Sequence, residues 1–115
     1  MWIKTDELQF VEKINQNEYE IIECVSFPDG SYTYGVNYID LEKYTDDELN
    51  TEVQGYYGEL EEVINEYGDS WRQVVAEIIA ENSDNLDNRL DNIHELADDL
   101  KINFGIEVDS YLLEN

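Results

Sequence analysis

Negative charge is the feature that most constrains how this chain can fold. Its 115 residues include 29 Asp and Glu against six Lys and Arg, which gives a formal net charge of −23 at pH 7. A soluble domain of this size typically needs a net charge of only about 2 to 8 units. Because excess like charge destabilises the compact state through self-repulsion, the surplus indicates that the charge has a use.

The chain nevertheless has the composition of a folded domain. Apolar residues make up 42% of it and aromatic residues 12%, whereas disordered chains are poor in both. Its length fits one domain, so we expect a single acidic domain over residues 1–115. The charged coat of a halophilic protein is disfavoured, because such coats accompany small aliphatic residues and only three alanines are present.

Cysteine usage and hydropathy indicate the compartment. Cys24 is the only cysteine, so no internal disulfide is expected. The first ten residues have neither the basic nor the apolar region of a secretory signal peptide. No apolar run reaches the roughly 18 residues that span a bilayer. We therefore expect a cytoplasmic protein, in the host cell cytosol if it is phage-encoded.

The first half of the chain predicts a small sheet. A short helix is expected over Thr5–Asn15. The runs Tyr19–Phe27 and Tyr32–Ile39 are partly alternating and rich in β-branched and aromatic residues. Between them, Pro28-Asp29-Gly30 has turn chemistry, because Pro presets φ and Gly accepts positive φ. Two strand-like runs around such a loop predict an antiparallel β-hairpin.

Helical periodicity begins after the hairpin. Thr45 and Glu48 fit a capping box, and apolar residues recur at four- and three-residue steps over residues 46–66. Gly55 and Gly58 interrupt this stripe at a cost of about 1 kcal/mol each. We therefore expect either one kinked helix or two shorter ones.

The remainder predicts two more helices and a final strand. Gly68 ends the first helical region, and Ser70–Gln73 reads as a second capping box that opens a short helix. A further helix is expected over residues 84–101 and a last strand over residues 106–112. The predicted class is α+β, with a small antiparallel sheet (the β-hairpin) followed by a helical bundle of two to three helices.

No motif in the sequence indicates an enzyme. His94, the sole histidine, has no nucleophile or orienting partner in a recognisable pattern, and Cys24 reads as a small core residue. The Asp/Asn cluster in residues 84–92 has a spacing of three and four with leucines between its members, and it lacks the central Gly of an EF-hand loop. Phosphate-binding glycine loops are absent. We expect no catalysis, no metal and no cofactor.

The arrangement of the acids is the strongest functional signal. On a helix, residues three or four apart lie about 5–6 Å from each other, and like charges there are destabilising. Basic residues that would relieve this repulsion are nearly absent, Arg89 being close to the only candidate. The predicted partner-binding residues form two stripes: Glu48, Glu52, Glu59, Glu62 and Glu66, then Asp84, Asp87, Asp91, Glu95 and Asp98. Tyr44 and Tyr57 are candidate anchors at their rim, since Tyr is enriched at interfaces.

The density of charge decides how the acids must be placed to imitate DNA. Duplex DNA carries about one charge per 100 Å² of surface, from one charge per ~1.7 Å of axis. A domain of this mass exposes about 6,500 Å², or roughly 220 Å² per acidic residue. Even spreading reaches only half the density of DNA. Mimicry therefore requires the acids to gather on one or two faces.

In size, charge and acid stripes the chain resembles the acidic decoy proteins of phages and mobile elements. These include the Ocr- and ArdA-type antirestriction proteins, the uracil-glycosylase inhibitors and several anti-CRISPR proteins. The resemblance covers general character along the whole chain, with no alignable motif, so no family residue is carried across. It implies a protein that occupies the DNA or RNA site of a host enzyme.

These observations predict a nucleic-acid-mimicking inhibitor of a host defence nuclease or another nucleic-acid-binding protein. The expected partner is basic, such as a nuclease or a Cas effector, and a homodimer is possible. Direct binding to nucleic acid or to an anionic membrane is disfavoured by repulsion. The alternative is an acidic adaptor, antitoxin or immunity protein that binds a basic partner outside any nucleic-acid groove. Whether the protein competes with DNA for the partner's binding site distinguishes the mimic from the adaptor.

Overall fold

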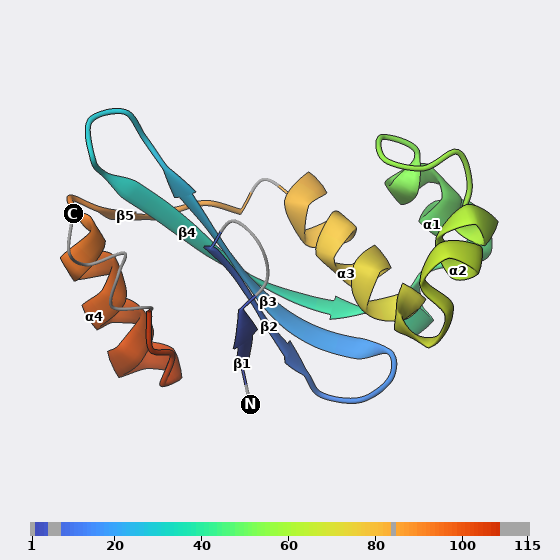
Figure 1. Ribbon diagram of the computed structural model, residues 1–115, viewed down its shortest axis with the longest axis horizontal. Coiled ribbons are helices and arrows are strands. Elements are labelled where there is room, and N and C mark those ends of the chain that lie inside the picture. The colour runs from blue at the N-terminus through green and yellow to red at the C-terminus, as the bar shows by residue number, and fades with distance from the viewer. Residues whose placement is uncertain (1, 5–7, 84, 109–115) are drawn as a thin grey trace.

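The computed structural model describes residues 2–4, 8–83 and 85–108 (Figure 1). The strands are β1 (Trp2–Lys4), β2 (Gln9–Lys13), β3 (Glu18–Ser26), β4 (Tyr32–Asp40) and β5 (Asn88–Leu90). The helices are α1 (Asp46–Val53), α2 (Leu60–Tyr67), α3 (Trp71–Asn82) and α4 (Ile93–Phe104), with short 3₁₀ helices η2 (Leu41–Lys43) and η3 (Gly68–Ser70). The predicted α+β class is confirmed.

The strands form one antiparallel sheet in the order β1-β2-β3-β4-β5. Its longest pairing is the β3–β4 hairpin, which runs from Glu18 opposite Asp40 to Ser26 opposite Tyr32. The connecting turn has Gly30 at a φ of 88°, a conformation that favours glycine. The predicted hairpin is confirmed.

Side-chain alternation buries the central strands on both faces. On β3, Tyr19 and Ile21 pack into a core with α1, α2 and α3. The alternating residues Ile22 and Cys24 pack into a second core with α4. Because successive side chains of a strand point to opposite faces, the sheet separates two cores. Figure 1 accordingly shows α4 on one side of the sheet and the other three helices on the opposite side.

The predicted helix over Thr5–Asn15 is wrong, because residues 9–13 form strand β2 between β1 and β3. Phe10 and Val11 are both buried, one in each core. A strand buried on both faces does not show the polar–apolar alternation that identifies a half-buried one. Thr5 lies outside the described residues.

The interrupted helical stripe forms two helices, α1 and α2. The predicted capping box is confirmed: the Glu48 N–H donates to the Thr45 hydroxyl, and the Thr45 N–H donates to the Glu48 carboxylate. The second helix begins where the Leu60 N–H donates to the Asn50 side-chain oxygen at 2.7 Å. It ends at Gly68, which takes a φ of 58°.

Helix α3 begins at Trp71 as expected, but the capping box predicted at Ser70–Gln73 is wrong. The Ser70 side chain makes no capping hydrogen bond. A capping residue needs an extended backbone, whereas Ser70 has φ −87° and ψ −1° because η3 runs directly into α3.

The helix predicted over residues 84–101 is also wrong in its first half. Residues 88–90 form β5, which pairs with β4 from Tyr32 opposite Leu90 to Tyr34 opposite Asn88. Helix α4 begins only at Ile93, after Asn92, whose side chain accepts hydrogen bonds from two backbone N–H groups. The predicted last strand is wrong at residues 106–108, which form none; its residues 109–112 lie outside the described part.

Tyr34 joins α4 to the sheet. Its hydroxyl donates a hydrogen bond to the Asp99 carboxylate, and its ring meets Phe104 edge-on at 6.1 Å between centroids. Burial, followed by the hydrogen bond to Asp99, raises the pKa of Tyr34 to about 12. The hydroxyl therefore stays protonated and keeps donating at neutral pH.

Gly35 gives the first test of the fold. A Cβ built on Gly35 would lie 1.5 Å from the Asn85 carbonyl oxygen, whereas one on Gly55 meets nothing within 4 Å. We expect Gly35→Ala to lower the free energy of unfolding by about 1–3 kcal/mol, because the backbone must move apart. Gly55→Ala is expected to be neutral or stabilising by less than about 1 kcal/mol. Urea unfolding of both variants measures these changes in the free energy of unfolding. Equal changes in the two variants would contradict the close approach of Gly35 to the Asn85 carbonyl oxygen.

Two cap positions give the second test. Asn92→Ala is expected to cost about 1 kcal/mol, because its side-chain oxygen accepts from the His94 and Glu95 N–H groups at 3.0 Å. Ser70→Ala, which removes no capping bond, is expected to change stability by less than about 0.5 kcal/mol. The melting temperatures of the two variants, compared with that of the unchanged protein, measure both losses of stability. A larger loss at Ser70 would restore the capping box predicted there.

Candidate functional site

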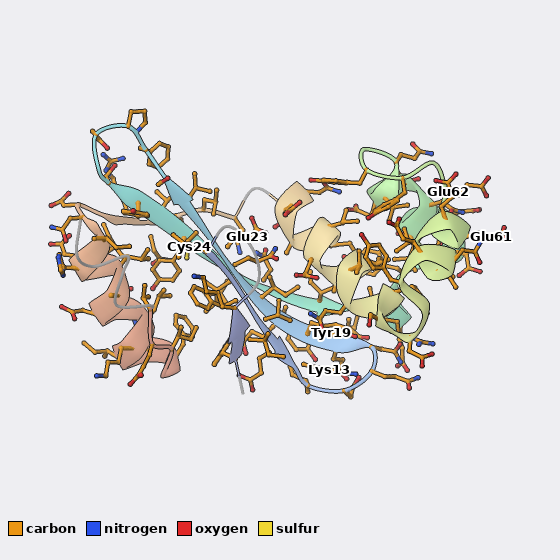
Figure 2. The ribbon with its side chains drawn as sticks, in the orientation of Figure 1. Lys13, Tyr19, Glu23, Cys24, Glu61 and Glu62 are labelled. Atoms are coloured by element: carbon orange, nitrogen blue, oxygen red, sulfur yellow. The ribbon has the colours of Figure 1, made fainter. Side chains whose placement is uncertain are left out.

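The most acidic part of the chain folds into one compact unit. Between Lys43 and Arg72 there is no basic residue. We call residues 46–69 the acidic lobe; they form α1, α2, the connection between these helices and the start of η3, and they lie at one end of the molecule (Figure 1). Its nine acids are Asp46, Asp47, Glu48, Glu52, Glu59, Glu61, Glu62, Glu66 and Asp69, all exposed except the half-buried Glu52. Figure 2 shows Glu61 and Glu62 at the rim of this end.

The structure brings the first predicted stripe together within this lobe. Some of its members also stabilise the fold. Glu48 belongs to the capping box, Glu62 accepts from the Gly58 N–H at 2.9 Å, and Glu52 accepts from the Asn82 side chain at 3.1 Å. Helical periodicity missed four acids of the lobe because they lie off the stripe. The signal that identifies them is the uninterrupted absence of Lys and Arg.

The second predicted stripe is wrong as a helical surface. Asp84 lies outside the described residues, Asp87 precedes β5, and Asp91 lies between β5 and α4. Only Glu95 and Asp98 are on α4. The Glu95 carboxylate accepts the Asp91 N–H at 2.7 Å, so it also takes part in starting the helix. Pairing of β5 with β4 prevents these acids from sharing one helix face.

The two groups of acids lie at opposite ends of the molecule. It measures 41 × 28 × 23 Å along its principal axes, and α4 and the acidic lobe occupy the two ends of the longest axis (Figure 1). The two groups of acids are therefore separate patches and do not form one continuous stripe. The lobe contains no basic residue, whereas Arg89 lies within the second group, so the lobe becomes the candidate interface.

A groove of about 700 Å³ opens beside the acidic lobe. It lies between β2 and β3 on one side and α3 on the other, and the α1–α2 connection borders it. Its lining includes the carboxylates of Glu23, Glu77 and Glu81, the rings of Tyr56 and Tyr57, and the apolar side chains of Val25, Val74 and Ile78. The sequence analysis missed this groove, because it is assembled from segments distant in the chain.

Hydrogen bonds hold the polar side chains of the groove in place. The Tyr56 hydroxyl donates to the Glu81 carboxylate at 2.8 Å, and the Gln9 side-chain amide donates to Glu23 at 2.5 Å. The hydroxyls of Tyr57 and Tyr67 are 2.5 Å apart, with the rings edge-on. This bond, followed by burial, raises the pKa of Tyr57 to about 12. Both groove tyrosines thus remain neutral near pH 7.

Cys24 and His94 are the two side chains that the sequence analysis considered for catalysis. Burial, followed by the nearby Glu23 carboxylate, raises the pKa of the Cys24 thiol to about 12, which makes it a poor nucleophile. The prediction that Cys24 is a core residue is confirmed. His94 is exposed on α4. Within the described ranges, no three His, Cys, Asp or Glu side chains are grouped to hold a metal ion.

Comparison of the chain with protein-family models, with curated proteins and with solved structures found no match. In the part of the chain that the structure describes, none of the helices has the length and hydropathy that crossing a membrane requires. The case for a function therefore comes from the acidic lobe and the groove beside it.

Cys24 supplies a test of this local electrostatics. At pH 8 a pKa of about 12 leaves roughly a thousandfold less thiolate than the ordinary value near 8.5. We expect a disulfide reagent to react with the native protein at least about a hundredfold more slowly than with the urea-unfolded chain. The absorbance of the coloured thiol that the reagent releases on reaction measures the rate for the native protein and for the unfolded chain. Equal rates would place the thiol at the surface.

Proposed function

We propose that this protein is an inhibitor that imitates nucleic acid. It occupies the DNA or RNA site of a basic nucleic-acid-binding protein, a host defence nuclease of the restriction or CRISPR type, in the host cytosol. The observation that carries the proposal is the acidic lobe, which has nine carboxylates and no basic residue; seven of the nine are on α1 and α2, Glu59 directly precedes α2, and Asp69 is in η3. An unrelieved charge of this kind opposes folding and therefore needs a use.

The amount of charge matches that of DNA along the molecule. Duplex DNA carries one charge per ~1.7 Å of axis, so a 41 Å stretch, the long dimension of this protein, carries about 24 charges. The net charge of the chain is −23. The total surface is 7042 Å², so even spreading gives about 240 Å² per acidic residue against about 100 Å² for DNA. Concentration of acids on the lobe reduces this difference where a partner binds.

The mechanism is occlusion of a basic site. Exposed carboxylates of the lobe stand in for phosphates and meet the Lys and Arg residues that hold the natural ligand. At most six acids can pair one-to-one with the basic residues of the chain, so at least 23 remain to attract a partner. Long-range attraction of this size accelerates association and is weakened by salt.

Displacement of nucleic acid tests the proposal. The protein is titrated into complexes of labelled duplex or guide RNA with a panel of restriction nucleases and Cas effectors, and fluorescence anisotropy follows release. We expect stoichiometric release from at least one of them, with an affinity that falls at least about tenfold between low and moderate salt. A target that binds this protein and its nucleic acid together, without loss of affinity for either, would show that mimicry is wrong and favour the adaptor alternative.

Two variants of equal charge locate the interface. Glu59→Lys, Glu61→Lys and Glu66→Lys together reverse three acids of the lobe. The control reverses three exposed acids at the other end of the molecule: Asp87, Asp98 and Glu107. We expect the first variant to lose at least about tenfold in inhibition and the control to lose much less, since close charge pairs dominate binding. Equal losses would mean that only net charge matters.

A further inference from the structure

The groove beside the acidic lobe combines three kinds of surface. Glu77 and Glu81 come from α3, Tyr56 comes from the α1–α2 connection, and Val25 and Ile78 provide apolar walls from β3 and α3. Its volume of about 700 Å³ lies within the range of about 300–1,000 Å³ that small-molecule sites show. The groove is therefore large enough for a long side chain and the backbone that carries it.

The charge of the groove selects a cation. Glu77 and Glu81 are one helical turn apart on α3 and both line the groove. The Tyr56 hydroxyl donates to the Glu81 carboxylate at 2.8 Å and so orients it. Glu23 adds a third carboxylate from β3 on the opposite wall. Negative charge on facing walls of a recess makes the local electrostatic potential more negative than it is over an open surface.

Among cationic groups, the lining suits arginine best. A guanidinium is planar, donates bidentately to carboxylates and stacks on aromatic rings such as Tyr56, which is 52% exposed. Its apolar stem packs along walls such as Val25 and Ile78. An ammonium is a compact, strongly hydrated charge that uses only the carboxylates. DNA offers a comparable site, because its narrow minor groove has an enhanced negative potential that attracts Arg.

We propose that this groove receives an arginine side chain from the protein whose basic surface meets the acidic lobe. The inference rests on the proposed function and adds to it the residue type that anchors the partner. Tyr56 and Tyr57 belong both to the groove and to the connection within the lobe, so one partner surface reaches both. The lobe attracts the partner at long range, and the buried arginine slows its dissociation.

Two peptides of equal length and charge test this inference without a known target. Isothermal titration calorimetry at near-physiological salt compares oligoarginine with oligolysine. We expect oligoarginine to bind at least about tenfold more tightly, the effect of one bidentate, stacked ion pair. Amide shifts in the NMR spectrum should change at Val25, Tyr56 and Ile78. Equal affinity for the two peptides would overturn the proposal.

Matched variants separate the groove from the lobe. Glu77→Gln with Glu81→Gln removes two charges from the groove at nearly constant volume, and Glu61→Gln with Glu66→Gln removes two from the outer side of α2. We expect the groove variant to lose the preference for oligoarginine, and the control to weaken both peptides equally and keep the preference. Unchanged melting temperatures and NMR dispersion establish that both variants fold. A preference that survives in the groove variant would overturn the proposal.

Two further outcomes distinguish this inference from the proposed function. Displacement of nucleic acid without any preference for oligoarginine would retain mimicry and reject the arginine site. A preference for oligoarginine that depends on Glu77 and Glu81, without displacement of nucleic acid from any target, would retain the site and reject mimicry. Binding of spermidine in the groove more tightly than oligoarginine would replace the arginine with a free polyamine.

Discussion

Burial of the central strands on both faces is the interaction on which the structure depends. Each carboxylate in excess raises the free energy of the compact state, and only six basic residues are present to offset 29 acidic ones. Strands β2 and β3 compensate by filling two cores at once: Val11 and Ile21 face α1–α3, while Phe10 and Ile22 face α4. The free energy gained by apolar burial needs no partner of opposite charge and is roughly proportional to the apolar area removed from water. It therefore allows every described acid to stay out of the core.

Local signals in the sequence predicted those elements whose cause is local. The Pro28-Asp29-Gly30 turn, the Thr45–Glu48 capping box and the Gly68 helix end each depend on a few adjacent residues, and the structure contains all three. Strands β2 and β5 depend on distant partners. For β5, leucines at helical spacing were outweighed by pairing with β4 and by Asn92 as the start of α4. The same reason explains why the acids of the second predicted stripe do not share one helix face.

In the proposed function, the acidic lobe and the groove imitate different properties of nucleic acid. The lobe presents repeated charge, which attracts any basic protein and is therefore a weak basis for selection. The groove presents charge together with shape and aromatic rings, which only a suitable side chain can use. No single helix carries this combination, because Glu23, Tyr56 and Glu81 come from three different parts of the chain. The sequence shows the lobe directly, whereas the groove exists only after folding.

The two edges of the sheet bear on how this protein behaves at high concentration. Edge strands β1 and β5 are three residues long, and each carries one of the six basic residues, Lys4 and Arg89. Short edges with a charged side chain resist the addition of a foreign strand. Two copies that approach edge to edge would also bring a charge of −23 against another of −23. Short charged edges and like net charge thus both oppose self-assembly through the sheet, and the proposed interface on the acidic lobe does not involve either edge.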